Sequence, residues 1–383
     1  MDVTGIICEY NPLHLGHKKQ IDTIKAVHPN GSIVCLMSGN YVQRGNPAIL
    51  DKSLRAKAAV LCGADLVLEL PITASLSSAE GFAHESVRIL GSFCNRLCFG
   101  AESADHASLL STAQALLSPA FPEALHKELD KGLSFPAARQ AALQNMGLQA
   151  NTLSLPNDIL ATEFCKAILA QGLTMQPMPI VRQGGYHDSV PDRSNPSATA
   201  LRNRMLQADA WLDYVPEVAR NCFKNAIFHD ISAGEQAIIY RLRSMTDADF
   251  EALPYGSEGL WRKLMHNSRT LTTLEEILSA TKSKRYTRTR LDRMVMCAFL
   301  DITASELSSP APYVRVLAFN DAGRALLKTA RSAGCFLNAG ESTDHPYQQL
   351  EQRVGRLYSL FATESESPIS EESRRIFYKN TGK

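Results

Sequence analysis

The sequence predicts an α/β protein whose first part is built on a parallel sheet. Apolar runs of strand length occupy residues 3–9, 32–39, 64–71 and 95–103. Stretches of helical length lie between them, so strands and helices alternate at the spacing of β–α–β units. These units form parallel sheets, and ligands bind beyond the carboxyl ends of their strands. We therefore expect the loops after these strands to form a ligand site.

The other elements of this first domain, which we place at 1–210, follow in a regular order. They are expected as a helix at 16–27, a helix capped by Asp51 and ending at Gly63, mostly helix at 105–172, a strand at 177–185 and a helix starting at 197. A helical region at 211–307 and a small α/β part at 308–383 follow. In that last part YVRVLAFN is a predicted strand, and a helix beginning near Asp321 comes next. The tail from about 364 is polar, and we expect it to be loosely ordered.

Composition and charge predict a soluble cytoplasmic protein without a membrane or protein partner. The 383 residues are 45% apolar and 21% charged, as in globular proteins. The net charge of +1 provides no general attraction for nucleic acid, so any basic surface must be local. Nine cysteines form no CxxC pair, which indicates reduced thiols and no metal site. No apolar run reaches about 18 residues.

The stretch EYNPLHLGHKKQ, from Glu9 to Gln20, places two histidines where the first strand passes into the first helix. A helix N-terminus offers backbone N–H groups and a partial positive charge, which suit a phosphate. Gly16 lets a flat base or a phosphate approach the backbone, and His14 and His17 can donate hydrogen bonds to phosphoryl oxygens. The alternative is that one histidine caps the helix and the other is solvated. The position of this stretch in a β–α–β unit favours a phosphate site over that alternative.

Other predicted strand ends also carry residues that suit a nucleotide. Arg44, Lys52 and Arg55 follow the second strand and suit a triphosphate or an acidic polymer, although for Lys52 and Arg55 a hydrated helix face is about equally consistent. Gly100 in FGAES and Arg182 after PMPIV stand at later strand ends, where backbone or guanidinium can contact a nucleotide.

Two predicted helix starts add weaker candidates. Asn157 and Asp158 begin PNDILATEF, where helix capping is the strong alternative. Ser197 and Thr199 begin SATALR with Arg202 behind them, and a plain N-cap competes there with phosphate binding.

The segment TKSKRYTRTRLDR, residues 281–293, is the densest basic stretch of the chain. Positive side chains with an interleaved tyrosine are typical of RNA contact, although such a run is often only a solvated face. Because its arginines cannot share one helical face, we expect the segment to start as a loop. The candidate RNA-binding residues are Lys284, Arg285, Tyr286, Arg288 and Arg290.

Taken together, these motifs resemble the bacterial tRNA(Met) cytidine acetate ligase family of the HxGH nucleotidyltransferase-like superfamily. The matching stretches are EYNPLHLGH, MSGNYVQRGNPAILDKSLRAKAA, GADLVLELP, SSAEGFA, FGAES, NDILATEF, SATALR, SEGLWRKL and KRYTRTRLDR. The resemblance implies a Rossmann-like catalytic domain followed by parts that help to hold tRNA. It also implies that ATP and acetate give acetyl-adenylate and diphosphate, and that N4 of cytidine 34 in elongator tRNA(Met) then takes the acetyl group.

The resemblance further implies which residues act on ATP. His14 and His17 would be catalytic, and Mg²⁺ would be carried with ATP. The implied ATP contacts are Ile7, Glu9, Tyr10, Asn11, His14, Gly16, His17, Gln20, Gly100, Asn157 and Arg182. Asn40 stands where many relatives carry histidine and receives no catalytic role, and Asp158 departs from the family's asparagine-rich pattern. Two alternatives remain at this point: an adenylyltransferase acting on a small phosphorylated metabolite, and a non-catalytic RNA-binding protein.

Overall fold

The computed structural model describes residues 2–148, 153, 155–181, 196–330 and 334–382. Its centre is an eight-stranded sheet in the order β10-β8-β5-β2-β1-β6-β7, with β9 paired to β8. The strands are β1 (Val3–Cys8), β2 (Ser32–Ser38), β5 (Leu66–Leu70), β6 (Arg96–Ala101), β7 (Gln176–Val181), β8 (Val314–Asn320), β9 (Phe336–Asn338) and β10 (Phe377–Lys379). A separate hairpin is formed by β3 (Tyr41–Val42) and β4 (Asn46–Pro47).

The five strands from the first part of the chain are parallel, as the alternation of strands and helices predicts. The chain leaves β1 toward β2 and β5 on one side and reaches β6 and β7 on the other. The carboxyl ends of β1 and β6 therefore border the point where the strand order reverses, which is where ligands bind in sheets of this kind. The α/β fold class predicted from the sequence is confirmed.

Both faces of the sheet are covered because successive residues of a strand point to opposite faces. Along β2, Val34 and Leu36 pack on one side with α4 and α8, while Ile33 and Cys35 pack on the other with α1 and α2. The helices of this part are α1 (Leu15–Val27), α2 (Lys52–Leu61), α3 (Ile72–Ser75), α4 (Ala79–Gly91), α5 (His106–Leu117), α6 (Phe121–Leu129), α7 (Phe135–Asn145), α8 (Pro156–Ala170), α9 (Ala198–Leu206) and α10 (Glu217–Phe223), with a 3-10 turn η2 (Leu212–Tyr214).

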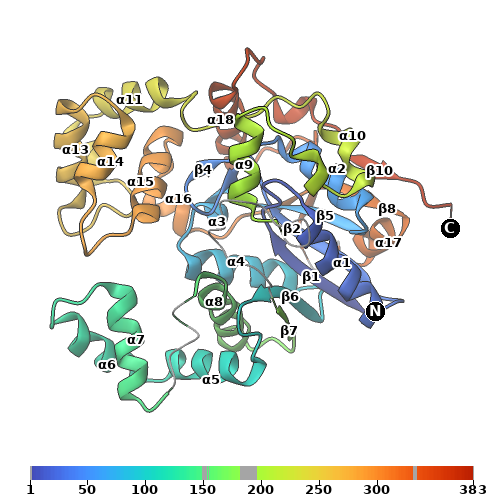
Figure 1. Ribbon diagram of the computed structural model, residues 1–383, viewed down its shortest axis with the longest axis horizontal. Coiled ribbons are helices and arrows are strands. Elements are labelled where there is room, and N and C mark those ends of the chain that lie inside the picture. Colours follow the sequence, from blue (N-terminus) through green and yellow to red (C-terminus); the bar gives the residue numbers. More distant parts are fainter. Residues whose placement is uncertain (1, 149–152, 154, 182–195, 331–333, 383) are drawn as a thin grey trace.

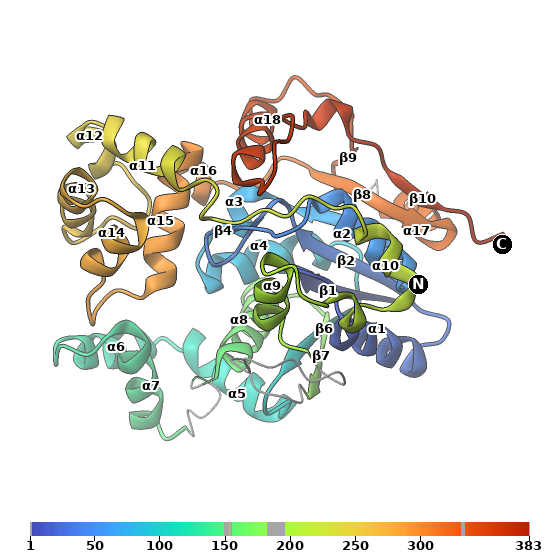
Figure 2. The ribbon, with the colours of Figure 1, turned by 45° about the horizontal axis from the view of Figure 1, so that its top comes forward.

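The region that follows is helical, and its apolar core is continuous with buried side chains of the first part, such as Tyr41 and Leu76, and of the C-terminal segment, such as Tyr358. Its helices are α11 (Glu235–Ser244), α12 (Asp247–Glu251), α13 (Leu260–Thr270), α14 (Leu274–Thr281), α15 (Arg288–Leu300) and α16 (Ala304–Ser308). Figures 1 and 2 show α11–α15 as a bundle beside the sheet, with α6 and α7 on the same side of the molecule. None of the helices in the described residues has the length and apolarity needed to cross a membrane.

The C-terminal segment returns to the sheet of the first part. Strand β8 pairs antiparallel with β5, and β10 pairs with β8. The remaining helices are α17 (Asp321–Ala330), α18 (Tyr347–Tyr358), η3 (Ser359–Phe361) and η4 (Glu371–Ser373). The expectation of a loosely ordered tail is wrong, because Glu371 and Arg374 are buried among charged partners and β10 is a strand of the sheet. The boundaries at 210 and 307 remain predictions.

Candidate functional site

A cavity of about 580 Å³ lies at the carboxyl ends of β1 and β6. The structure gathers around it ten of the residues that the resemblance implies for ATP, although they come from distant parts of the sequence. These lining residues are Ile7, Glu9, Tyr10, Asn11, His14, Gly16, His17, Gln20, Gly100 and Asn157. Arg182 lies outside the described residues. The role of this set in binding ATP stays a prediction.

The two histidines form one unit at the start of α1. His14 is the N-cap: its Nδ1 accepts from the backbone N–H of Gly16 at 3.2 Å, and Nδ1 of His17 accepts from the N–H of His14 at 3.3 Å. The rings stack with centroids 3.8 Å apart. Because each Nδ1 accepts a hydrogen bond, each neutral ring carries its proton on Nε2, where it is a donor. The capping alternative is thus correct for His14, and it leaves a donor suited to a phosphoryl oxygen.

The turn that leads into α1 is fixed from several sides. The side chain of Asn11 accepts a hydrogen bond from the N–H of Ile49 at 2.8 Å, and its carbonyl accepts from Arg202 at 2.8 Å. Arg55 donates to the carbonyl of Glu9 at 2.6 Å. Such anchoring holds the N–H groups of the first helical turn, and the positive end of the helix dipole, at one wall of the cavity.

A second wall is fixed by a reciprocal pair of carboxylates between β6 and α8. Asp158 accepts from the backbone N–H of Glu102 at 2.8 Å, and Glu102 accepts in turn from the N–H of Asp158 at 2.8 Å. Glu102 also accepts from the side-chain amide of Asn157 at 2.7 Å. The helix start is therefore capped by Glu102, and Asp158 holds the strand end that follows Gly100. Sequence reasoning missed this role of Glu102 because its partners lie more than 50 positions away.

Lys52 and Arg55 do not line this cavity, so the expectation that they bind a triphosphate is wrong. The hydrated-face alternative is wrong as well, since both are buried. Arg55 also donates to the carbonyls of Leu50 at 2.8 Å and Ser38 at 3.0 Å. These carbonyls lie at the end of β2 and in the loop before α2, so a long rigid donor fork satisfies them where water cannot reach. The cavity is instead lined by Lys19, Arg44 and Arg202.

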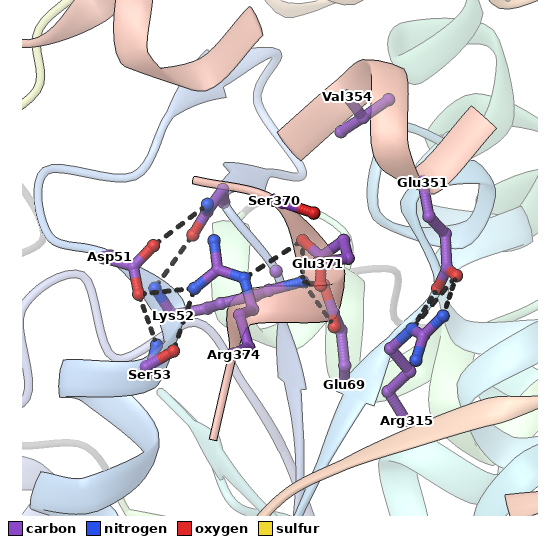
Figure 3. Close-up of polar contacts among 12 residues, drawn as sticks. Asp51, Lys52, Ser53, Glu69, Arg315, Glu351, Val354, Ser370, Glu371 and Arg374 are labelled. Carbon is purple, nitrogen blue, oxygen red and sulfur yellow. Dashed lines mark hydrogen bonds and ion pairs between the residues drawn. The ribbon is translucent and has the colours of Figure 1, made fainter. Parts of the chain in front are cut away.

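Lys52 belongs to a buried ionic cluster that residues from the end of the chain complete (Figure 3). Its Nζ lies 2.7 Å from Glu69 and 2.8 Å from Glu371. Arg374 lies 2.8 Å from the carboxylate of Asp51, the N-cap of α2. Burial alone would raise the pKa of Asp51, but the charge and hydrogen bond of Arg374 overcome it, so the pKa lies below its usual value. No local pattern in the polar tail indicated this arrangement.

The basic segment is a loop that leads into α15, as expected, and two of its arginines, Arg285 and Arg288, have acidic partners. Arg285 and Tyr286 both contact Glu258, at 2.9 and 2.6 Å. Arg288 binds both oxygens of Glu275 at 2.8 Å, and this hydrogen bonding lowers the pKa of Glu275 to about 2.

Arg290 donates to the carbonyl of Tyr255 at 2.9 Å, whereas Lys284 is exposed. Ion pairs at a surface contribute little to stability and exchange readily with other partners. A contact between this segment and RNA stays a prediction.

Comparison with known proteins agrees with this geometry. A family model described as HIGH Nucleotidyl Transferase matches residues 1–373. A tRNA(Met) cytidine acetate ligase of Clostridium perfringens is 36% identical over 86% of this chain and 87% of its own length, and one of Clostridium tetani is 37% identical over 87% and 88%.

Solved structures agree with the same assignment. The crystal structure of apo Thermotoga maritima TmcAL covers all of both chains with a TM-score of 0.91 at 27% identity. A second crystal structure, of that protein bound with alpha-thio ATP, gives a TM-score of 0.88 at 28% identity. The chain described here therefore belongs to the tRNA(Met) cytidine acetate ligase family, within the HIGH nucleotidyl transferases.

Proposed function

We propose that this protein uses ATP and acetate to form N4-acetylcytidine at position 34 of elongator tRNA(Met) in the cytoplasm. The observation that carries the proposal is the cavity at the β1–β6 ends, which joins the HLGH helix start to Gly100 and Asn157. The similarity of the whole chain to tRNA(Met) cytidine acetate ligases supports the same reaction.

In the first step, a carboxylate oxygen of acetate attacks the α-phosphorus of ATP. The bond from this phosphorus to the bridging oxygen breaks, and diphosphate leaves with the electron pair. Negative charge builds on the phosphoryl oxygens, where the N–H groups at the start of α1 and the Nε2–H groups of His14 and His17 can stabilise it. Lys19 and Arg44 add positive charge at the same cavity.

In the second step, N4 of the cytosine attacks the acetyl carbon of acetyl-adenylate and AMP leaves. The reacting base must leave its stack to reach this carbon, at a cost of a few kcal/mol. The described residues contain no group of three or more His, Cys, Asp or Glu that could hold a metal ion. We therefore propose that Mg²⁺ arrives with the phosphates of ATP, and none of these steps depends on a protein metal site.

The test is to incubate the protein with ATP, radiolabelled acetate and elongator tRNA(Met), and to follow acetate-dependent exchange between diphosphate and ATP in parallel. ATP-dependent label in the tRNA supports the proposal. Exchange that does not require acetate, with AMP transferred to a phosphorylated metabolite, would instead support a small-molecule adenylyltransferase. Absence of both activities with RNA binding retained would support a non-catalytic RNA-binding protein.

A further inference from the structure

A second cavity, of about 170 Å³, lies between the nucleotide cavity and the helical bundle. It shares Asn46 and Ile231 with the lining of the nucleotide cavity. At its other end it shares Arg288 with an open depression that Lys282, Lys284 and Tyr286 also line. The three hollows thus follow one another from the basic segment to the site of ATP chemistry.

The β3–β4 hairpin separates the nucleotide cavity from the second cavity. The N–H of Gln43, in the turn of the hairpin, donates to the carboxylate of Glu9 at 2.9 Å, which ties the turn to the nucleotide cavity. On its other side, Gly45 packs directly on the backbone of α15: an added Cβ would lie 2.5 Å from the N of Arg293, and φ is +82°. Only glycine fits there. The hairpin is therefore held on both sides, and Asn46 follows immediately.

The second cavity combines apolar walls with a polar end. Its apolar side chains are Ile231, Leu274, Leu278, Val295 and Met296, and its charged ones include Glu275, Arg288 and Asp292. A buried cavity of about 150 Å³ in another protein accommodates one benzene molecule. The volume here is therefore suited to one six-membered ring rather than to a whole nucleotide. Its apolar walls also suit a base, because proteins hold unstacked flat bases between apolar side chains.

Asn46 supplies the polar group at the junction. Its side-chain amide forms no hydrogen bond within the part of the chain that the structure describes, although its residue is partly buried. An asparagine amide has one acceptor and two donor hydrogens. These match the amino group and the ring N3 of cytosine, whereas uracil presents the opposite pattern at both positions.

We infer that the second cavity receives the cytosine that is to be acetylated and that Asn46 positions its exocyclic amine toward acetyl-adenylate. This inference rests on the proposed function. Oδ1 of Asn46 accepts one N4 hydrogen and Nδ2 donates to N3. N4 then forms a bond to the acetyl carbon, the bond from this carbon to the phosphate oxygen breaks, and the N4 proton passes to the departing AMP phosphate.

The experiment separates the two half-reactions in Asn46→Ala. Acetate activation is measured by diphosphate–ATP exchange and by capture of the acetyl group with hydroxylamine, which does not require a base pocket. Acetyl transfer to tRNA is measured with radiolabelled acetate. We expect activation within about twofold of the wild type and transfer lowered roughly 5- to 150-fold, the range for one lost bidentate base contact. Binding of tRNA should change little, because phosphate contacts dominate affinity.

Two further variants complete the design. Ile231→Trp fills the junction and should also block transfer while hydroxylamine capture continues. Gln349→Ala removes an exposed amide on α18 and should leave both half-reactions unchanged. Equal loss of activation and transfer in Asn46→Ala, or normal transfer in both cavity variants, would overturn the inference. A wild type that never activates acetate would refute the proposed function itself, which is a different result.

Discussion

Gly100 provides the most direct test of where the nucleotide binds. It is the fifth residue of β6, it is exposed, and it lines the cavity. An added Cβ would meet no protein atom within 4 Å. Gly100→Ala therefore costs the free protein nothing in packing, and restricting the unfolded chain should stabilise it by about 0.4–1 kcal/mol. Any loss of ATP affinity must then come from the methyl group occupying space that the ligand needs.

The size of that loss can be estimated from the misfit of one carbon. One methylene too many in a binding pocket costs about 1–3 kcal/mol, which corresponds to a roughly 5- to 150-fold higher Kd for ATP. Isothermal titration calorimetry measures the Kd, and urea denaturation measures stability. We expect weaker ATP binding together with unchanged or increased stability.

The matched control is Gly334→Ala, another glycine where an added Cβ would make only ordinary contacts, 3.4 Å or more from Phe336. It should leave the Kd for ATP unchanged and alter stability by the same small amount as Gly100→Ala. If Gly100→Ala binds ATP within twofold of the wild type, the β6 end does not contact the nucleotide and our placement of ATP is wrong.

Three further predictions concern His17, the basic segment and the ionic cluster around Lys52. His17→Ala should lower diphosphate release about 10²- to 10³-fold, the usual effect of removing one donor to transition-state charge, while tRNA binding measured by filter retention stays near normal. Changing Arg285 and Arg288 together to Ala should weaken tRNA binding and reduce the slope of log K against log salt by about two. Arg374→Ala removes the ion-pair partner of the buried Asp51 and one of the two partners of Glu371, and it should lower the free energy of unfolding by about 3–5 kcal/mol at pH 7, measured by urea denaturation. Because the folded-state pKa of Asp51 is lowered, its share of this stabilisation is present above the ordinary aspartate value of about 3.9 and is lost as the pH falls through the lowered value.

Each of these variants has a control and an outcome that contradicts it. His28→Ala, at the other end of α1, is the control for His17→Ala and should retain activity. Loss of tRNA binding in the His17 variant would mean that His17 has a structural role. Arg88→Ala, which also breaks a surface ion pair with a glutamate, is the control for the double variant. An unchanged salt slope in the double variant would mean that the basic segment is only a solvated face. Arg375→Ala, which removes an exposed neighbour of Arg374, is the control for Arg374→Ala. A deficit in the Arg374 variant that widens below pH 4 would contradict the sign derived for Asp51.

Sequence reasoning succeeded where the structural cause is local. The first strand, the HLGH helix start and the Asp51 cap each depend on residues a few positions apart, and continuous apolar runs of strand length identified the parallel strands. It failed for Lys52, because the partner that turns this residue inward is 319 positions away. Charge alone cannot distinguish a buried cation from a ligand-binding one. The polar tail was misjudged for the same reason, since Glu371 and Arg374 are polar by composition yet buried by pairing.

The ionic cluster around Lys52 has a consequence for synthesis on the ribosome. A bacterial chain grows at about 5–20 residues per second, so Glu371 follows Lys52 after roughly 15–60 s. β5 has no β8 beside it until residues 314–320 have emerged, so its unpaired edge is open to other chains or to chaperones during most of that interval, and Lys52 lacks Glu371 until the interval ends. Completion of the central sheet is therefore delayed until the last segment has emerged. Nascent chains that stop short of Glu371 would carry the HLGH motif without β10 and without the ion pairs that Glu371 and Arg374 make to Lys52 and Asp51.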